Sequence, residues 1–189
     1  MKKFELTSET KINIFGKKLF RIKALVSFGV VKTGETGGWV EKEENVNQSG
    51  DAWVFGNAEV FGNARVSGDA RVSGDARVFD NAMVFGNARV SGDAWVFGNA
   101  EVFGNAEVFG NAEVSGNADY TTIHGFGTQF RTTTFFRCKD KQVKVSCGCF
   151  YGTIPEFREQ VKNTRDGKIA EEYLMIADLM EKHFAEEAK

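Results

Sequence analysis

The stretch Gly50-Asp51-Ala52-Trp53-Val54-Phe55 opens a six-residue repeat that continues to Gly110-Asn111-Ala112-Glu113-Val114-Ser115. Its pattern is Gly-(Asp/Asn)-Ala-x-Val-(Phe/Ser), and Asp80 is the one exception at the glycine position. A unit this short cannot bury a core by itself, so its copies must stack on one another. The segment 50–119 therefore predicts a solenoid.

The six-residue period also excludes an amphipathic helix, in which apolar residues recur at spacings of three and four. The alanine and the valine of each repeat stand two positions apart, which places both side chains on one face of a strand. The Gly-Asp or Gly-Asn pair tolerates the left-handed backbone of a corner. We therefore expect a short strand and a corner from each repeat, with Ala52, Val54 and their equivalents pointing inward.

The repeat resembles the hexapeptide repeat of left-handed parallel β-helices over the whole of 50–119. In that family an aliphatic and a small residue point inward, and valine and alanine hold those places here. The resemblance implies three repeats per triangular coil, about four coils, and left-handedness. The expected fold is mainly β, a left-handed parallel β-helix with a cap at each end.

The flanking segments are expected to be those caps, because a parallel solenoid exposes a strand edge at each end. Residues 11–15 and 19–26 predict a β-hairpin around Gly16. Residues 130–137 and 143–147 predict a second hairpin, followed by helices at about 155–164 and 170–185. The predicted domains are an N-terminal β cap (1–37), a hexapeptide-repeat β-helix (38–119), and a C-terminal β-hairpin and two-helix cap (120–189).

The composition of the chain limits the cellular compartments and the classes of partner that fit it. A net charge of -2 argues against nucleic acid and anionic membranes as partners. Three cysteines, all in the C-terminal flank, suit a reducing cytoplasm better than a disulfide framework. No stretch approaches the ~20 apolar residues of a membrane helix, and the N-terminus does not resemble a signal peptide. We expect a soluble cytoplasmic protein.

Two positions of each repeat point outward, one before the valine and one after it, and residues eighteen apart stack in columns. The columns after the valine read Phe61, Phe79, Phe97, Ser115; Ser67, Phe85, Phe103, Thr121; and Phe55, Ser73, Ser91, Phe109. One interpretation is an aromatic ladder that stabilises the coils. The other is a contact surface for a homodimer, a homotrimer or another protein. The residues expected to form that surface are Phe61, Phe79, Phe97, Phe85, Phe103, Trp53 and Trp95.

The columns before the valine carry charge. They read Trp53, Arg71, Arg89, Glu107; Glu59, Arg77, Trp95, Glu113; and Arg65, Met83, Glu101, Asp119. One interpretation is a set of solvated ladders, with Arg71 on Trp53, Arg77 on Trp95, and an exposed Glu59–Arg77 ion pair. The alternative is a surface whose four arginines, Arg65, Arg71, Arg77 and Arg89, bind an anion such as a nucleotide.

The repeat lacks the residue types that usually act as catalysts in this architecture. Hexapeptide-repeat acyltransferases use a histidine as general base, and carbonic anhydrases of this architecture use three histidines on zinc, whereas residues 39–119 contain neither His nor Cys. His183, at the end of the last predicted helix, is expected to be a capping or surface residue, and His124 follows the last coil. Cys138, Cys147 and Cys149 favour structural thiols over a metal site. We predict no catalytic residue, no metal and no cofactor.

The flanks carry a closer resemblance. Gly37-Gly38-Trp39-Val40-Glu41-Lys42-Glu43-Glu44-Asn45 and Cys147-Gly148-Cys149-Phe150-Tyr151-Gly152-Thr153-Ile154-Pro155-Glu156-Phe157 are similar to segments of small hexapeptide-repeat proteins of phages, prophages and bacteria. The resemblance leaves a phage or a bacterial origin open, and for a phage-borne protein it implies action in the host cytoplasm on a host factor such as a defence component.

The function expected from the sequence is a non-enzymatic binding or scaffold protein that self-associates through its Phe columns. Two alternatives stay open at this stage. One is an acyltransferase-like enzyme with a site between subunits near His124, and the other is capture of an anionic nucleotide.

Overall fold

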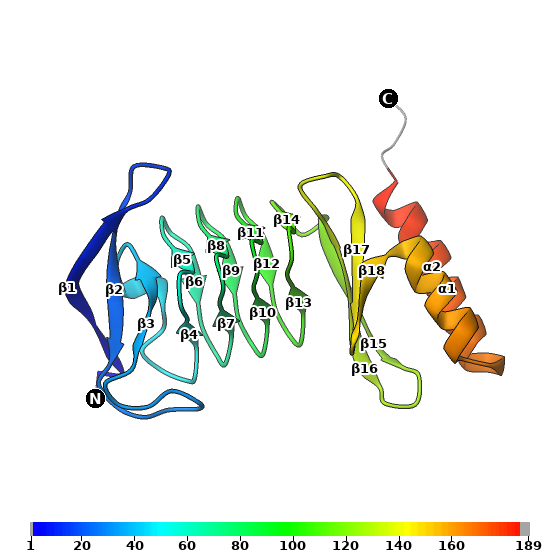
Figure 1. Ribbon diagram of the computed structural model, residues 1–189, viewed down its shortest axis with the longest axis horizontal. Helices are drawn as coiled ribbons and strands as arrows, with labels where there is room; N and C mark the ends of the chain where they lie inside the picture. The colour runs from blue at the N-terminus through cyan, green and yellow to red at the C-terminus, as the bar shows by residue number, and fades with distance from the viewer. Residues whose placement is uncertain (1, 186–189) are drawn as a thin grey trace. The chain divides into compact units, whose positions relative to one another are not determined.

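The repeat folds into a parallel solenoid built from very short strands. The computed structural model describes residues 2–185, and residues 1 and 186–189, the outermost residues of the expected domains, lie outside the described residues. The chain divides into two compact units, Met1–Asn117 and Ala118–Lys189. The first unit contains the repeats, whose strands form successive rungs in Figure 1.

Each repeat contributes one two-residue strand, and strands eighteen residues apart pair in parallel. Val54 pairs with Val72, and Val72 with Val90, so a coil closes after three repeats. The expected β-helical class with about four coils is therefore confirmed. The strands are β4 (Trp53–Val54), β5 (Glu59–Val60), β6 (Arg65–Val66), β7 (Arg71–Val72), β8 (Arg77–Val78), β9 (Met83–Val84), β10 (Arg89–Val90), β11 (Trp95–Val96), β12 (Glu101–Val102), β13 (Glu107–Val108) and β14 (Glu113–Val114).

The interior of the solenoid consists of the alanine and valine columns. Ala52, Val54 and their equivalents as far as Val114 are almost completely buried, as expected. The corners place the glycine in the left-handed region, for example φ +67° at Gly68, and Asp80 adopts φ 57° in the same position. Side-chain amides stack at the corners, where Asn63 donates to Asn81 over 3.2 Å. The repeat therefore supplies both the buried side chains of the core and the polar contacts at the corners.

The N-terminal segment continues one sheet of the solenoid. Strands β1 (Phe4–Ile12) and β2 (Lys18–Ala24) form the expected hairpin, and β1 begins earlier than the predicted strand at residue 11. Strand β3 (Thr36–Val40) pairs with β2 and, in parallel, with β5 of the first coil. A short 3-10 helix, η1 (Glu43–Asn45), follows it. The hairpin lies beside the first coil in Figure 1.

Several carbonyls of each coil accept hydrogen bonds from amides of the coil before it. Trp53 N donates to Ala70 O over 3.1 Å, for example. The corresponding carbonyls of the first coil have no earlier coil beside them and need donors from elsewhere. Strand β3 supplies some of them, and three side chains supply others. Asn45 Nδ2 donates to Gly62 O and Ala64 O, Arg21 Nη1 to Gly56 O, and Lys3 Nζ to Gly50 O and Ala52 O.

Lys3 should make stability depend on pH. Burial lowers the pKa of Lys3 to about 8, against the opposing attraction of Asp51 and Asp69, while a lysine of the unfolded chain titrates near 10.5. Between these values the unfolded chain holds a proton that the folded chain has released, so the free energy of unfolding rises with pH. We expect the native protein to gain stability relative to Lys3→Met from pH 8 to pH 10, by at most ~1.4 kcal/mol per pH unit. Urea titrations at matched pH measure the difference, and parallel profiles for the two proteins would contradict this account of Lys3.

The second unit is an antiparallel sheet with two helices. Strands β15 (Tyr120–Phe126), β16 (Arg131–Arg137), β17 (Val143–Cys147) and β18 (Phe150–Thr153) pair in chain order. Helices α1 (Ile154–Thr164) and α2 (Gly167–Phe184) follow. The predicted hairpin corresponds to β16 and β17, and β15 and β18 widen it to four strands.

The helices of this unit pack on the sheet through a common core that includes Phe135, Val145, Phe157, Tyr173 and Met180. Helix α1 begins with the predicted capping box, since Glu156 N donates to Thr153 Oγ1 over 3.3 Å and Thr153 N to Glu156 Oε2 over 2.7 Å. Most apolar side chains of the helices therefore belong to this core, whereas Met175 and Leu179 of α2 are exposed.

Candidate interaction face

The solenoid presents three faces, which differ in what covers them. The covered face contains β5, β8, β11 and β14, the arginine face contains β4, β7, β10 and β13, and the open face contains β6, β9 and β12. Each face displays one column of residues before the valine and one column after it.

On the covered face, the Phe column is an aromatic ladder under the N-terminal hairpin. The rings of Phe61 and Phe79 stack with centroids 5.0 Å apart, and those of Phe79 and Phe97 with centroids 5.1 Å apart. Phe15, at the turn of the hairpin, lies against Phe61, Phe79 and Trp95. The exposed fractions are only 4% for Phe61 and 8% for Phe79. The expectation that these two rings form an exposed contact surface is wrong, because the chain covers them itself.

Glu59, on the same face, is a buried carboxylate between two cations. Lys11 Nζ lies 2.8 Å from Glu59 Oε1, and Arg77 Nε lies 3.4 Å from Glu59 Oε2. The expected Glu59–Arg77 pair is present, but it is not the exposed pair that the sequence suggested, because Glu59 is buried. The guanidinium of Arg77 also lies 5.6 Å from the ring centre of Trp95, which confirms the predicted cation–π contact.

On the arginine face, Trp53 belongs to the core. It is completely buried, and the rings of Phe4 and Phe28 meet its edge or face at centroid distances of 5.8 and 5.3 Å. The prediction of Trp53 as part of an outer surface is therefore wrong. Both covering rings come from the N-terminal segment, which lies outside the repeat.

The four arginines do not share one site. Arg65 is on the open face, Arg77 is paired with Glu59 on the covered face, and Arg71 and Arg89 lie in register on the arginine face. Arg89 Nη1 also lies 4.0 Å from Glu107 Oε1. The structure brings at most two of them together, so the expected four-arginine anion site is not formed within one chain.

The open face carries the exposed apolar side chains of the solenoid. Phe85 and Phe103 stack with centroids 5.2 Å apart and an angle of 12° between the rings. Phe103 is 48% exposed, Met83 beside it is 37% exposed, and Phe85 is half-buried. Two of the predicted surface residues, Phe85 and Phe103, thus lie on an accessible and preformed sheet face.

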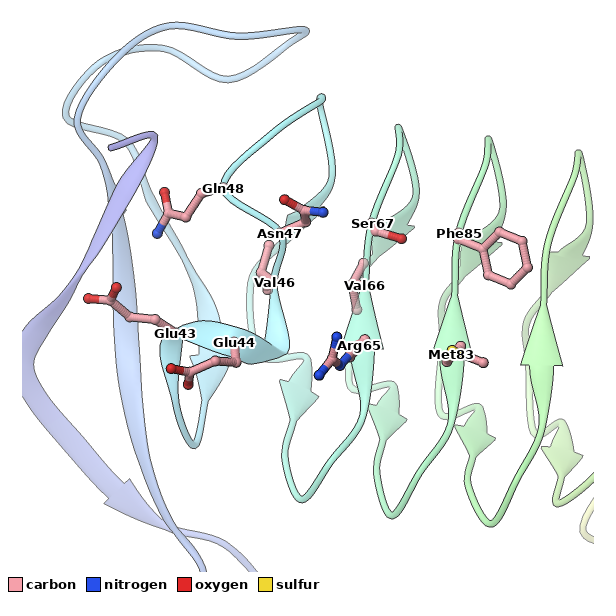
Figure 2. A pocket seen from close by; sticks show the side chains of 10 residues that line it. All are labelled: Glu43, Glu44, Val46, Asn47, Gln48, Arg65, Val66, Ser67, Met83 and Phe85. Carbon is pink, nitrogen blue, oxygen red and sulfur yellow. The ribbon is translucent and has the colours of Figure 1, made fainter. Parts of the chain in front are cut away.

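The same face is hollow at its N-terminal end. A cavity of about 570 Å³ lies over Ser67 and Val66, between Phe85 and the segment that contains Asn47 and Gln48. Figure 2 shows Ser67 on the coil before Phe85, with the Phe85 ring projecting from the next coil. The small serine continues the Phe column and leaves space where a third ring would stand.

Opposite charges stand at the two ends of the open face. Arg65, on β6, is exposed at the hollow end, and Glu101, on β12, is half-buried at the other end. Met83 separates them, because Arg65 pairs with Met83 and Met83 with Glu101 along the ladder. Among residues 2–185, neither Arg65 nor Glu101 has an ion-pair partner.

The histidines and cysteines do not assemble into a reactive cluster. His124 is exposed on β15, and His183, near the end of α2, contacts the ring of Phe184. Burial raises the pKa of the Cys138 thiol to about 11, while Thr133 Oγ1 donates to Cys147 Sγ over 3.1 Å. Within the described part of the chain, no three His, Cys, Asp or Glu side chains are placed to bind a metal ion.

Two features of this arrangement were missed from the sequence. The sequence places Phe15 at the end of the predicted strand 11–15, whereas β1 ends at Ile12 and Phe15 lies in the turn, where its ring contacts Phe61 and Phe79. Ser67 begins a column that continues with Phe85 and Phe103, and the segment with Asn47 and Gln48, which has no regular repeat, makes the hollow beside it.

Stacked parallel coils with alanine and valine inside define the class: this is a β-solenoid protein. The repeat matches the family model described as "YdcK Beta solenoid repeat" over residues 52–74, 64–78, 70–84, 76–92 and 82–98. These matches together span 52–98, which is about a quarter of the chain. No curated protein is similar enough to the chain to count as a relative. No helix in the described segment 2–185 is long and apolar enough to cross a membrane.

Proposed function

We propose that the protein is a non-enzymatic binding or scaffold protein that self-associates through the open face. The observation that carries the proposal is the exposed Phe85–Phe103 ladder with Met83 beside it. Aromatic residues and methionine are enriched at protein interfaces, and a rigid sheet loses little conformational entropy on binding. Phe61 and Phe79 are covered by the hairpin, and Phe103, at 48% exposure, is the most accessible ring of the Phe columns.

The proposal predicts that Phe103→Glu prevents self-association. A carboxylate at this position would be buried against apolar side chains in the complex, and burying an unpaired charge is strongly unfavourable. We expect the variant to be monomeric at concentrations where the native protein is oligomeric, a shift on the order of a hundredfold or more in Kd. Light scattering coupled to size-exclusion chromatography measures the mass.

The control is Leu179→Glu. Leu179 is 58% exposed on α2, so it tests whether a new charge at any exposed apolar side chain gives the same result. We expect this variant to keep the native mass. A monomeric native protein, or an unchanged mass for Phe103→Glu, would remove the basis of the proposal.

The flank motifs and the thiols support a finer form of this proposal. The segments around Trp39 and Cys149 support membership of the phage and prophage group, and free thiols at Cys138, Cys147 and Cys149 suit a reducing cytoplasm. We infer that the oligomer acts in the host cytoplasm on a host factor, such as a defence component. We expect one host protein to co-purify with the tagged chain in stoichiometric amount. If no host protein co-purifies from infected cells, the host-factor proposal fails and the self-association proposal is unaffected.

A further inference from the structure

We propose that the occupant of the open face is a second copy of the chain with its solenoid axis antiparallel to the first, so that Arg65 of each copy faces Glu101 of the other. The proposal rests on the self-association proposed above and specifies its geometry. Its basis is the order of outward residues on the face, together with the hollow over Ser67.

The column before the valine is self-complementary. It runs from a cation through an apolar residue to an anion, as Arg65, Met83 and Glu101 on adjacent coils. A two-fold axis that lies between two such faces, parallel to β9, reverses the order of the coils. It therefore places Met83 against Met83, and each Arg65 against Glu101 of the second copy. The charges at the two ends of the face acquire the ion-pair partners that they do not have within one chain.

The column after the valine is complementary in shape under the same axis. Ser67, Phe85 and Phe103 follow one another on the same three coils, with a stacked pair formed by the last two. Reversing the order sets Phe85 against Phe85 and Phe103 against Ser67. The exposed Phe103 ring of one copy is then directed at the 570 Å³ hollow of the other. The hollow is large enough for a phenyl ring, which accounts for the serine at this point of the column.

Arrangements with parallel axes do not give this match. In those arrangements the same coil of each copy lies at the same position along the axis. Arg65 of one copy therefore lies nearest Arg65 of its neighbour, and Glu101 lies nearest Glu101. Like charges at one level of an interface oppose association. Elsewhere on the solenoid, arginine and glutamate pair within the chain, as in Arg77–Glu59 and Arg89–Glu107. Of the two carboxylates at the edge of the hollow, Glu43 already pairs with Lys2.

A charge exchange tests the orientation. Arg65→Glu alone puts glutamate against Glu101 at both ends of the dimer, and Glu101→Arg alone puts arginine against Arg65 at both ends. We expect each variant to self-associate on the order of a hundredfold more weakly than the native protein. An equimolar mixture of the two should form a heterodimer near the native affinity, because both contacts then join glutamate to arginine. Native mass spectrometry, with one variant carrying a mass tag, identifies the heterodimer.

The results distinguish two claims, that the interface is the open face and that the two copies are antiparallel. Dimers of the single variants with native affinity, or a mixture that fails to pair, would overturn the antiparallel arrangement. A trimeric native protein would overturn it as well, while a dissociated Phe103→Glu variant would still support the open face. If Phe103→Glu stays associated, the proposed function fails first. Circular dichroism and the melting temperature of each variant verify that it is folded.

Discussion

Trp53→Ala is expected to lower the free energy of unfolding by about 3–5 kcal/mol, the range for removal of a fully buried aromatic side chain. Trp53 has no exposed surface and contacts Phe4 and Phe28 of the N-terminal segment. The substitution opens a cavity between that segment and the first coil, where the surrounding backbone is held by hydrogen bonds and can collapse only in part. Guanidinium denaturation followed by circular dichroism measures the change.

Trp95→Ala is the matched control, because Trp95 occupies the same position of its repeat and is only half-buried. We expect a loss about half as large, since part of its surface is already in water. The two residues look alike in the repeat pattern, which predicts an outward side chain for both. Equal losses for the two variants, or a loss below about 1 kcal/mol for Trp53→Ala, would mean that Trp53 is not part of the core.

The second large effect is expected at the corners. Gly68 has φ +67°, and a Cβ there would lie 2.9 Å from the backbone nitrogen of Gly86 in the next coil. Gly68→Ala therefore combines the cost of a left-handed alanine, about 1–2 kcal/mol, with overpacking against a backbone that cannot move aside, about 1–3 kcal/mol. A loss of about 2–5 kcal/mol in the free energy of unfolding is expected from thermal or urea denaturation.

Gly104→Ala isolates the first of these two costs. Gly104 has nearly the same backbone angle, φ +66°, but nothing lies within 4 Å of its added Cβ. We expect a loss of only about 1–2 kcal/mol, from the left-handed conformation alone. Losses of the same size at both glycines would show that contact between adjacent corners adds no penalty.

The coils were predictable because the residues of each repeat determine its strand and its corner. Ala and Val two residues apart fix an inward strand face, and the following Gly fixes the corner, so the register of Val54 on Val72 follows from counting. The same count assigns an outward direction to Trp53, Phe61 and Phe103 alike. It does not show what lies on each outward residue, because the covering rings of Phe4, Phe15 and Phe28 come from segments without a period.

The arginines illustrate a second limit. Arg65, Arg71 and Arg77 follow one another at intervals of six residues, which makes them neighbours in sequence but places them on three different faces. The predicted columns already separated them, and the anion-site hypothesis treated a cluster in sequence as a cluster in space. The burial of Glu59 could not be predicted from the repeat for a related reason. Its partner Lys11 belongs to the N-terminal hairpin, which lies outside the repeat.

The donors that meet the first coil define what the N-terminal segment of this solenoid has to supply. Lys3, Arg21 and Asn45 bring N–H groups to carbonyls of the first coil, at Ala52, Gly56 and Ala64. A segment that replaces the N-terminal residues must therefore bring several N–H donors to the same carbonyls if the first coil is to stay ordered.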